Sequence, residues 1–479
     1  MGAGTGLSML CSIVVGKYIA VSMGPTGTGL YAILLQVHGS ALAVATFGSG
    51  AQNALVRGVA CRSGGEGQRF LETVLSIVIL ATVIITASLI MLAPWIVRLV
   101  HDRSHFISVG LIRLMVLSVF AGICASILMA VINGFRAIKA LATITIINSS
   151  TSVLLVGPAV YLARRGHPSA FVVMIATALL VQASFALVFI LRQGWLRHVL
   201  LFRFSISAIK EFLGLASATL LTSIVAQGAM LLLQAWILRS HGLEGVGIVS
   251  AATLISTGYL MLLLNAMSTY YLPALSGARS EQDARRLVQN MYRFVVLVGV
   301  PLITGVIVFK PIIVDMLYSD RFLPALHIMR WMLVGGFFRT IAWTLSTPVI
   351  ARGDIRILIF SELAWNIVYV GSAVIAGKAV HSLEAIGVCY LASYIGYLAY
   401  FVYYIHKRYP HVLGNNELAM TLVGTFIVVI ASIVLWNRTT VNWDALLVCI
   451  CAALSSWFVL SSGERIKIRH AIRVRLPVW

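Results

Sequence analysis

Long apolar stretches alternate with short polar ones along the whole chain. A helix needs about 20 mostly apolar residues to cross the hydrocarbon core of a bilayer, and fourteen stretches of this sequence reach that length. The pattern predicts an all-α polytopic membrane protein with about 14 transmembrane helices. The predicted spans are 5–23, 30–56, 70–97, 107–133, 140–162, 169–191, 212–237, 248–274, 294–317, 325–350, 357–377, 385–405, 418–436 and 445–462.

The polar connections are short, and the longest of them runs from residue 192 to residue 211. None is long enough to form a soluble domain. The first apolar run begins almost at Met1 and contains Lys17, with no small-residue cleavage site after a clean apolar core. A cleavable signal peptide is therefore not expected.

Two glycine motifs share one spacing, the first between the first two spans and the second between the seventh and eighth. The matching pairs, all at an offset of 218 residues, are Gly24/Gly242, Gly27/Gly245 and Gly29/Gly247. This repeat predicts two parallel six-helix halves. Because neither motif follows a strand, each predicts a tight turn rather than a phosphate loop. The predicted domains are a six-helix bundle over 1–192, a cytoplasmic linker over 193–211, a second bundle over 212–406, and two extra helices with a basic tail over 407–479.

Composition supports the membrane interpretation and explains most of the charge. The chain is 60% hydrophobic and 10% charged, with 35 Lys and Arg against 15 Asp and Glu. Soluble proteins carry about 25% charged residues, so an ordinary soluble enzyme or a nucleic-acid-binding domain is excluded. Loops on one side hold 22 of the basic residues and loops on the other side hold eight. By the positive-inside rule, both termini are cytoplasmic.

Five basic residues lie within or at the margins of spans, where a charge costs about 3 kcal/mol and usually faces a polar cavity or a partner. Lys17 is predicted to face a cavity, although its long side chain could also reach an interface. Arg113 could do either. Lys310 is expected at the interface or paired with Asp315.

Arg330 and Arg339 both belong to the tenth span and lie nine residues apart, half a turn off the same helix face. They cannot both point at one spot. We predict that Arg339, the deeper of the two, faces the cavity. Arg330 would serve the outer part of that cavity or an interfacial lipid.

Glu362 is the acid placed furthest into any span. A buried carboxylate either takes up a proton or pairs with a cation. Two interpretations stay open: an ion pair with Arg339, or a switch that responds to protons or sodium. They are compatible, because a pair that breaks on protonation is a switch. Nearby, tyrosines at helical spacing form one face of the twelfth span, for which packing is favoured over lipid contact or a sugar-stacking wall; these are Tyr390, Tyr394, Tyr397, Tyr400, Tyr403 and Tyr404.

No nucleotide-binding, zinc or catalytic-nucleophile motif is present. We therefore expect neither an enzyme nor a cofactor or metal site, and any energy must come from gradients or from the substrate.

The order of several motifs resembles a known family. The segment Gly16–Leu30 looks like the opening of the bacterial O-antigen and enterobacterial-common-antigen flippases, the polysaccharide-transport branch of the multidrug/oligosaccharidyl-lipid/polysaccharide exporter superfamily. The resemblance covers about residues 5–406. Its other carriers are Asn133–Arg136, Tyr271–Ser276, Ser319–Phe322, Trp331, Gly335, Ile350–Gly353 and Glu362.

The resemblance implies two six-helix bundles in a V around a cationic cavity. These would move an undecaprenyl-pyrophosphate-linked oligosaccharide, such as an O-antigen or exopolysaccharide repeat unit, from the cytoplasmic to the periplasmic leaflet of the inner membrane. Lys17, Arg339 and Glu362 match the family pattern, and they are also charged residues within spans, where a charge is costly. A polysaccharide polymerase and a chain-length regulator are implied partners, together with membrane lipids and without nucleic acid.

Three alternatives remain. A lipid II flippase of the same superfamily would share the fold. A cation-coupled multidrug exporter should hold a deep acid in its first half, where Lys17 lies in the first span instead. A membrane-embedded glycosyl- or phosphotransferase should show clustered Asp and His near a membrane face, and the sequence has no such cluster.

Overall fold

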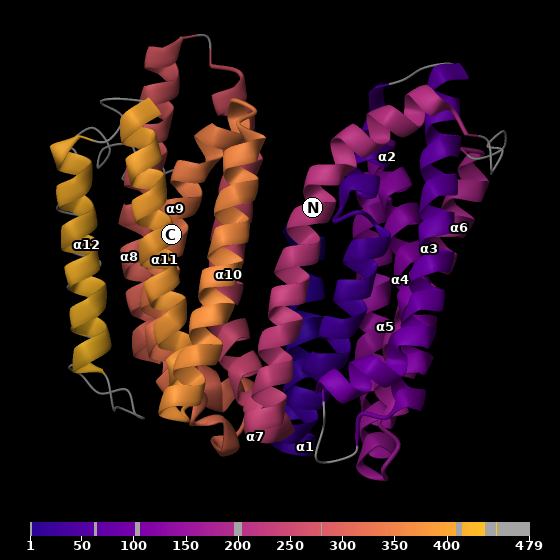
Figure 1. The fold of residues 1–479 in the computed structure, drawn as a ribbon, viewed down its shortest axis with the longest axis horizontal. Coiled ribbons are helices and arrows are strands. Elements are labelled where there is room, and N and C mark those ends of the chain that lie inside the picture. The colour runs from indigo at the N-terminus through magenta and orange to yellow at the C-terminus, as the bar shows by residue number, and fades with distance from the viewer. Residues whose placement is uncertain are drawn as a thin grey trace, which may run out of the picture. The chain divides into compact units, whose positions relative to one another are not determined.

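The computed structural model describes residues 2–61, 65–100, 106–195, 204–278, 280–408, 414–435 and 447. In these residues the regular structure is entirely helical (Figure 1). The α-helices are α1 (Gly2–Ala45), α2 (Gly50–Cys61), α3 (Gly65–Val100), α4 (Val109–Gly134), α5 (Ile138–Arg164), α6 (Ser169–Gln193), α7 (Ile206–Ser276), α8 (Glu281–Leu317), α9 (Ala325–Ala351), α10 (Ile355–Val380), α11 (Glu384–Arg408) and α12 (Asn415–Val434), with a 3₁₀ turn at Asp320–Phe322.

The two longest helices each contain a sharp change of direction at a glycine. Gly24 in α1 has φ 66° and ψ −162°, and Gly242 in α7 has φ 69° and ψ −173°. A positive φ of this kind favours glycine, which has no Cβ to clash with the backbone. The tight turns predicted at the two glycine motifs are confirmed, and each helix consists of two arms.

The membrane spans follow the hydropathy pattern closely. Within the described residues, eleven helices are long and apolar enough to cross a membrane. Because α1 and α7 each contribute two arms, these correspond to the first thirteen predicted spans. The predicted span 445–462 lies almost entirely outside the described residues. The chain is a multi-pass, all-α membrane protein.

One predicted span is interrupted. The sequence predicts a continuous helix over 30–56, but α1 ends at Ala45, and Phe47, Gly48 and Ser49 all have positive φ before α2 begins. A Cβ on Gly48 would overlap the Thr219 carbonyl, and the Thr219 hydroxyl donates to the Phe47 carbonyl at 2.9 Å. The prediction is wrong here because the first arm of α7 approaches the chain at this break, and hydropathy does not detect such an approach.

Packing divides the chain into two compact units. Unit 1 comprises Met1–Ser250 and Leu317–Arg321, and unit 2 comprises Ala251–Met316 and Phe322–Trp479. The first arm of α7 thus packs with α1–α6. The predicted boundary at 193–211 follows the sequence repeat rather than packing and stays a prediction, as does the V-shaped arrangement.

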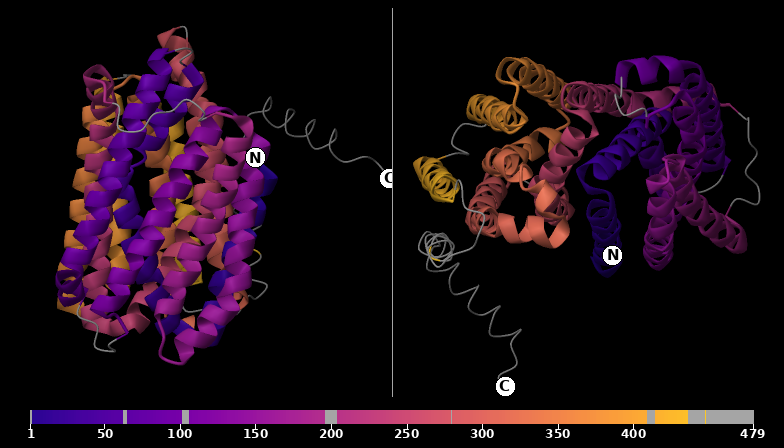
Figure 2. Two further views of the ribbon diagram at one scale, coloured as in Figure 1. Left: turned by 90° about the vertical axis from the view of Figure 1, so that its right-hand side faces the viewer. Right: turned by 90° about the horizontal axis from the view of Figure 1, so that it is seen from below.

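Unit 1 is built around α4, which packs against α6, α3, α2 and α1. Its helices run lengthwise beside one another (Figures 1 and 2). At one end a buried apolar cluster joins α4, α5 and α6 through Val131, Ile132, Ile144, Ala186 and Ile190. Large apolar side chains remain exposed on the outer faces of these helices, as expected for a surface that meets lipid.

Unit 2 is built around α9, most of whose residues are buried. Two glycines let α9 and α11 approach closely. A Cβ on Gly387 would lie 2.7 Å from the Ile328 carbonyl, and one on Gly335 would lie 2.8 Å from the Tyr390 ring. Side chains on the face of α9 that points toward α11 are therefore in direct contact with α11.

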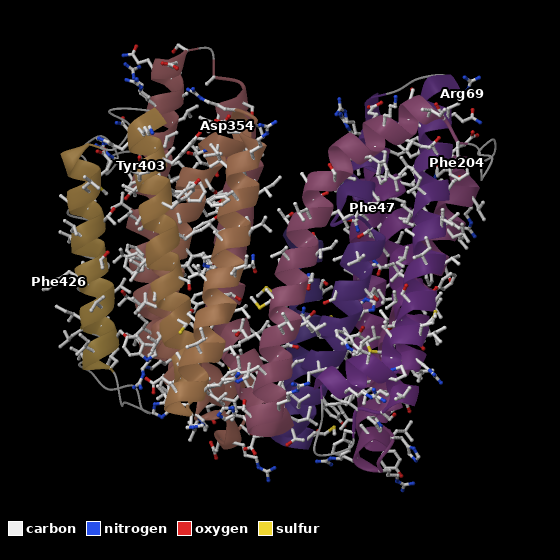
Figure 3. All side chains as sticks on the ribbon, viewed as in Figure 1. Phe47, Arg69, Phe204, Asp354, Tyr403 and Phe426 are labelled. Carbon is white, nitrogen blue, oxygen red and sulfur yellow. The ribbon has the colours of Figure 1, made fainter. Side chains whose placement is uncertain are left out.

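The thirteenth span, α12, is fastened to α8. Arg293 and Glu417 form an ion pair at 2.9 Å, and the hydroxyls of Tyr292 and Thr421 hydrogen-bond at 2.6 Å. The opposite face of α12 exposes apolar side chains such as Phe426 (Figure 3). The helix is thus an integral part of unit 2, joined at its first turns by polar contacts.

Candidate functional site

The two arginines of α9 lie on the central helix of unit 2. This helix packs mainly against α11, also contacts α10 and α12, and has most of its residues buried. Arg330 is 5% exposed, and Arg339 is half-buried. As the helical spacing predicts, the two side chains meet different partners.

Arg339 is held by tyrosines of α11. Its Nη1 donates to the Tyr390 hydroxyl at 3.4 Å, and its guanidinium carbon lies 5.8 Å from the centre of the Tyr394 ring. A cation over an aromatic face is attracted by the negative face of the ring. Neither contact neutralises the guanidinium, so Arg339 keeps its full positive charge inside the membrane span.

Glu362, on α10, also contacts a tyrosine of α11. It accepts a hydrogen bond from the Tyr397 hydroxyl at 2.8 Å, while its own backbone carbonyl accepts from Asn366. No ion pair within 4.0 Å joins Glu362 to Arg339 among the residues that the structure describes. Of the two interpretations left open for Glu362, the direct ion pair with Arg339 is therefore not formed, because the tyrosine face of α11 supplies the partners of both side chains. Glu362 still attracts Arg339 over a longer distance.

The tyrosine face of α11 is a packed aromatic seam. Tyr390 and Tyr394 are buried, and their ring centroids lie 4.8 Å apart. Trp365 of α10 packs at 4.8 Å from Tyr394, and Tyr369 packs at 5.6 Å from Tyr390. The interpretation as packing is confirmed for these residues. Tyr403, one of the same predicted face, is instead 64% exposed (Figure 3).

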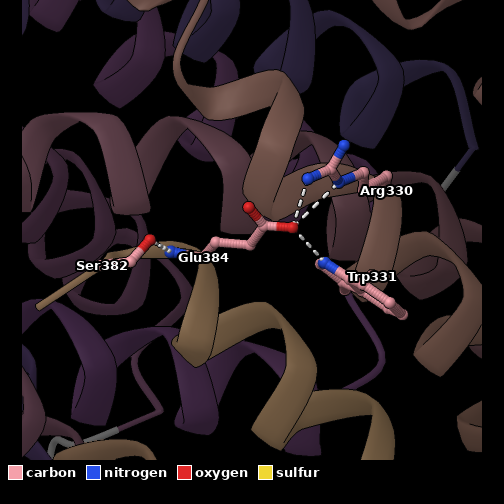
Figure 4. Close-up of polar contacts among 4 residues, drawn as sticks. All are labelled: Arg330, Trp331, Ser382 and Glu384. Atoms are coloured by element: carbon pink, nitrogen blue, oxygen red, sulfur yellow. Dashed lines mark hydrogen bonds and ion pairs between the residues drawn. The ribbon is translucent and has the colours of Figure 1, made fainter. Parts of the chain in front are cut away.

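Arg330 is engaged by Glu384, the first residue of α11 (Figure 4). Its Nε donates to Glu384 Oε1 at 3.1 Å, its Nη2 contacts the same oxygen, and Trp331 Nε1 donates to that oxygen at 2.6 Å. Arg330 was predicted to serve the outer part of a cavity or an interfacial lipid, and its carboxylate partner was not predicted. Glu384 lies 54 positions away along the chain, and one sequence shows no signal that would join the two.

Lys17 and Arg113 belong to unit 1, on the first arm of α1 and on α4. Both side chains are exposed. Lys17 lies seven positions before the turn at Gly24, and Arg113 is the fifth residue of α4. Of the five predicted site residues, the structure brings Arg339 and Glu362 together through α11, and it holds Arg330 separately.

Three further titratable residues are buried, and their burial was not predicted from the sequence. Lys310 was expected at an interface or paired with Asp315. Its side chain is 0% exposed and Asp315 is exposed, so the pairing with Asp315 is wrong, and the interfacial position stays a prediction. His38 is buried in unit 1, where its ring hydrogen-bonds to Ser118 at 3.3 Å. Glu72, the third residue of a predicted span, is 1% exposed.

Comparisons with known proteins agree with this fold. Residues 23–327 match the family described as "Polysaccharide biosynthesis protein". The chain is 25% identical over 415 residues to the Lipid III flippase of Escherichia coli (strain K12), and equally to that of Shigella flexneri, covering 83% of this chain and 94% of each relative.

Solved structures give the same picture at the level of the fold. The Lipid II flippase MurJ in an inward closed conformation has a TM-score of 0.74 at 17% identity, covering 98% of this chain and 99% of that one. An inward-facing multidrug resistance MATE family transporter of the MOP superfamily has a TM-score of 0.64 at 12% identity, covering 90% and 96%. All these relatives carry the names of flippases or transporters.

Proposed function

The chain belongs to the polysaccharide biosynthesis protein family, and we propose that it flips an undecaprenyl-pyrophosphate-linked oligosaccharide from the cytoplasmic to the periplasmic leaflet of the bacterial inner membrane by alternating access. The single observation that carries the proposal is Arg339, a charged guanidinium half-buried in the central helix of unit 2, which has no carboxylate partner within 4.0 Å in the described part of the chain. Such a cation inside a membrane span is costly and marks a place for an anionic ligand.

The chemistry of the substrate explains why a cation belongs there. A diphosphate cannot cross hydrocarbon without replacing its water, and a guanidinium offers a planar fork of donors that matches phosphate oxygens. The tyrosines around Arg339 hold its position without cancelling its charge. In unit 2, Arg330 is a second proposed anion-binding residue, which becomes available when it is released from Glu384. In unit 1, Lys17 and Arg113 are proposed for the same role. The lipid tail would stay in the bilayer throughout.

The carried glycan would be an O-antigen, exopolysaccharide or similar repeat unit, handed to a polymerase and a chain-length regulator. A lipid II flippase is the second candidate, favoured by the high similarity of the fold to MurJ. A multidrug exporter fits less well, because Arg339 presents a cation to the substrate rather than an acid. Both termini would be cytoplasmic.

Reconstitution tests the proposal directly. Purified protein in liposomes should accelerate movement of an undecaprenyl-diphosphate oligosaccharide between leaflets, because fixed cations replace the water of its diphosphate. Movement is measured by accessibility of the labelled sugar to an impermeant reagent. Lipid II in parallel liposomes separates the two candidates. Protein-dependent movement of neither lipid would contradict the proposal.

Glu362 is the proposed coupling residue. When it takes up a proton it loses its attraction for Arg339, and this would release the guanidinium toward the substrate. In Glu362→Gln the amide oxygen still accepts from Tyr397, but the charge and the titration are gone. We expect the variant to flip substrate with a flattened pH profile, measured as the initial rate in liposomes over a pH series. Glu281→Gln, at an acid that is 73% exposed, should keep the wild-type profile, and a wild-type profile in Glu362→Gln would exclude this coupling.

A further inference from the structure

A second charged cluster lies in unit 2, near the first turns of α9 and the start of α11. Arg330 and Trp331 of α9 contact Glu384 of α11, and Lys310 of α8 lies close enough for Arg330 to act on it electrostatically. The close approach of the two backbones at Gly387 brings this part of α9 near the start of α11. The cluster is separate from Arg339 and its tyrosines.

The charges in this cluster do not balance. Two side chains are cationic and one is anionic, and the anion is engaged by Arg330 and Trp331. Lys310 is 0% exposed, and in the described chain no acceptor reaches its Nζ. Arg330 is near enough to repel it. A buried ammonium without a partner is strongly unfavourable, so the cluster lacks one negative charge.

The geometry around Glu384 is that of an occupied oxyanion site. One oxygen, Oε1, receives Arg330 Nε at 3.1 Å, Arg330 Nη2, and Trp331 Nε1 at 2.6 Å (Figure 4). Charged and neutral N–H donors that converge on one point are a common arrangement for binding phosphate oxygens. The carboxylate thus stands where a phosphate oxygen would be held.

Glu384 is also the member of the cluster that can leave. Its side chain is 30% exposed, whereas that of Arg330 is 5% exposed. Its backbone is fixed at the start of α11, where its N–H donates to the Ser382 hydroxyl at 3.2 Å. The carboxylate can therefore rotate outward while the helix stays in place.

We propose that Arg330, Trp331 and Lys310 form a phosphate-binding site that Glu384 occupies as an internal plug. When the carboxylate rotates out, a phosphate group takes its place on Arg330 and Trp331, and its additional negative charge neutralises Lys310. The phosphate belongs either to an anionic lipid headgroup or to a diphosphate. The site extends the role that the proposed function gives to Arg330 and, for a diphosphate, rests on that function, but phosphate binding to the purified protein is measured apart from flipping.

Calorimetric titration of the full-length protein in detergent tests this site, with inorganic phosphate as the probe and chloride at equal ionic strength as the reference. Glu384→Gln keeps the size of the plug but removes its charge, so it should bind phosphate about 10-fold more tightly than the wild type, as expected when a charged competitor worth about 1.4 kcal/mol is lost. Adding Lys310→Met should reverse this gain. Lys378→Met, at an exposed lysine of α10, should have no effect.

Two further arms identify the source of the phosphate. Tighter binding of short-chain phosphatidylglycerol than of inorganic phosphate to Glu384→Gln supports a lipid headgroup, and tighter binding of inorganic pyrophosphate supports a diphosphate. The proposal is overturned if Glu384→Gln binds phosphate no better than the wild type, or no better than it binds chloride. This arm does not require that Lys310→Met folds.

Discussion

Replacing Arg339 by alanine is expected to lower the initial rate of flipping about 10- to 100-fold, because a hydrogen bond to a charged group contributes about 1.5–3 kcal/mol. The cause is the loss of a guanidinium that tyrosines hold in place without neutralising it. Arg339→Lys should recover part of the rate, since it restores the charge but not the planar fork. The rate is measured in liposomes at matched protein content.

The matched control is Arg356→Ala, which removes an exposed arginine at the start of α10. It changes the net charge of unit 2 by the same amount and should flip at the wild-type rate. Thermal unfolding in detergent separates a folding defect from a transport defect, because loss of a half-buried charge need not destabilise the fold. A wild-type rate for a well-folded Arg339→Ala would remove the observation on which the proposed function rests.

The sequence predicts the spans of this protein well because the bilayer imposes one length on every helix that crosses it. It also predicts the turns at Gly24 and Gly242, since the repeat at a fixed offset singles out those glycines. The break at Phe47–Ser49 was missed, because it depends on a contact with Thr219, more than 160 residues away, and leaves no mark in local hydropathy.

For the site, the sequence predicted which charged residues matter but not which residues they contact. The cost of a charge in a membrane selected Arg339 and Glu362, and helical geometry separated Arg339 from Arg330. Their partners were not predictable, because tyrosine hydroxyls took the places where an ion pair was expected. The burial of Lys310 was not predicted either, because its position near a helix end does not indicate how α8 packs against its neighbours.

The two glycine motifs of the sequence repeat meet each other in unit 1, and this contact predicts a large effect of mutation. A Cβ on Gly29 would overlap the Leu243 carbonyl oxygen, and a Cβ on Gly247 would overlap the Pro25 carbonyl oxygen. The clash is with backbone on both sides, so no side chain can rotate to relieve it. Gly29→Ala and Gly247→Ala should each destabilise the protein by about 1–3 kcal/mol, the usual cost of overpacking, or by more.

The controls are glycines on the same arms with open space at the Cβ position, Gly39 in α1 and Gly258 in α7. In a helix interior, alanine is favoured over glycine by about 1 kcal/mol, so Gly39→Ala and Gly258→Ala should be neutral or stabilising. Thermal unfolding of the purified variants in detergent measures the difference. The two glycines lie at the same contact, so moving the two turns apart relieves both overlaps at once. The double variant Gly29→Ala/Gly247→Ala should therefore lose less stability than the sum of the losses of the two single variants. Single variants as stable as the Gly39→Ala control would mean that the two turns do not touch in the folded protein.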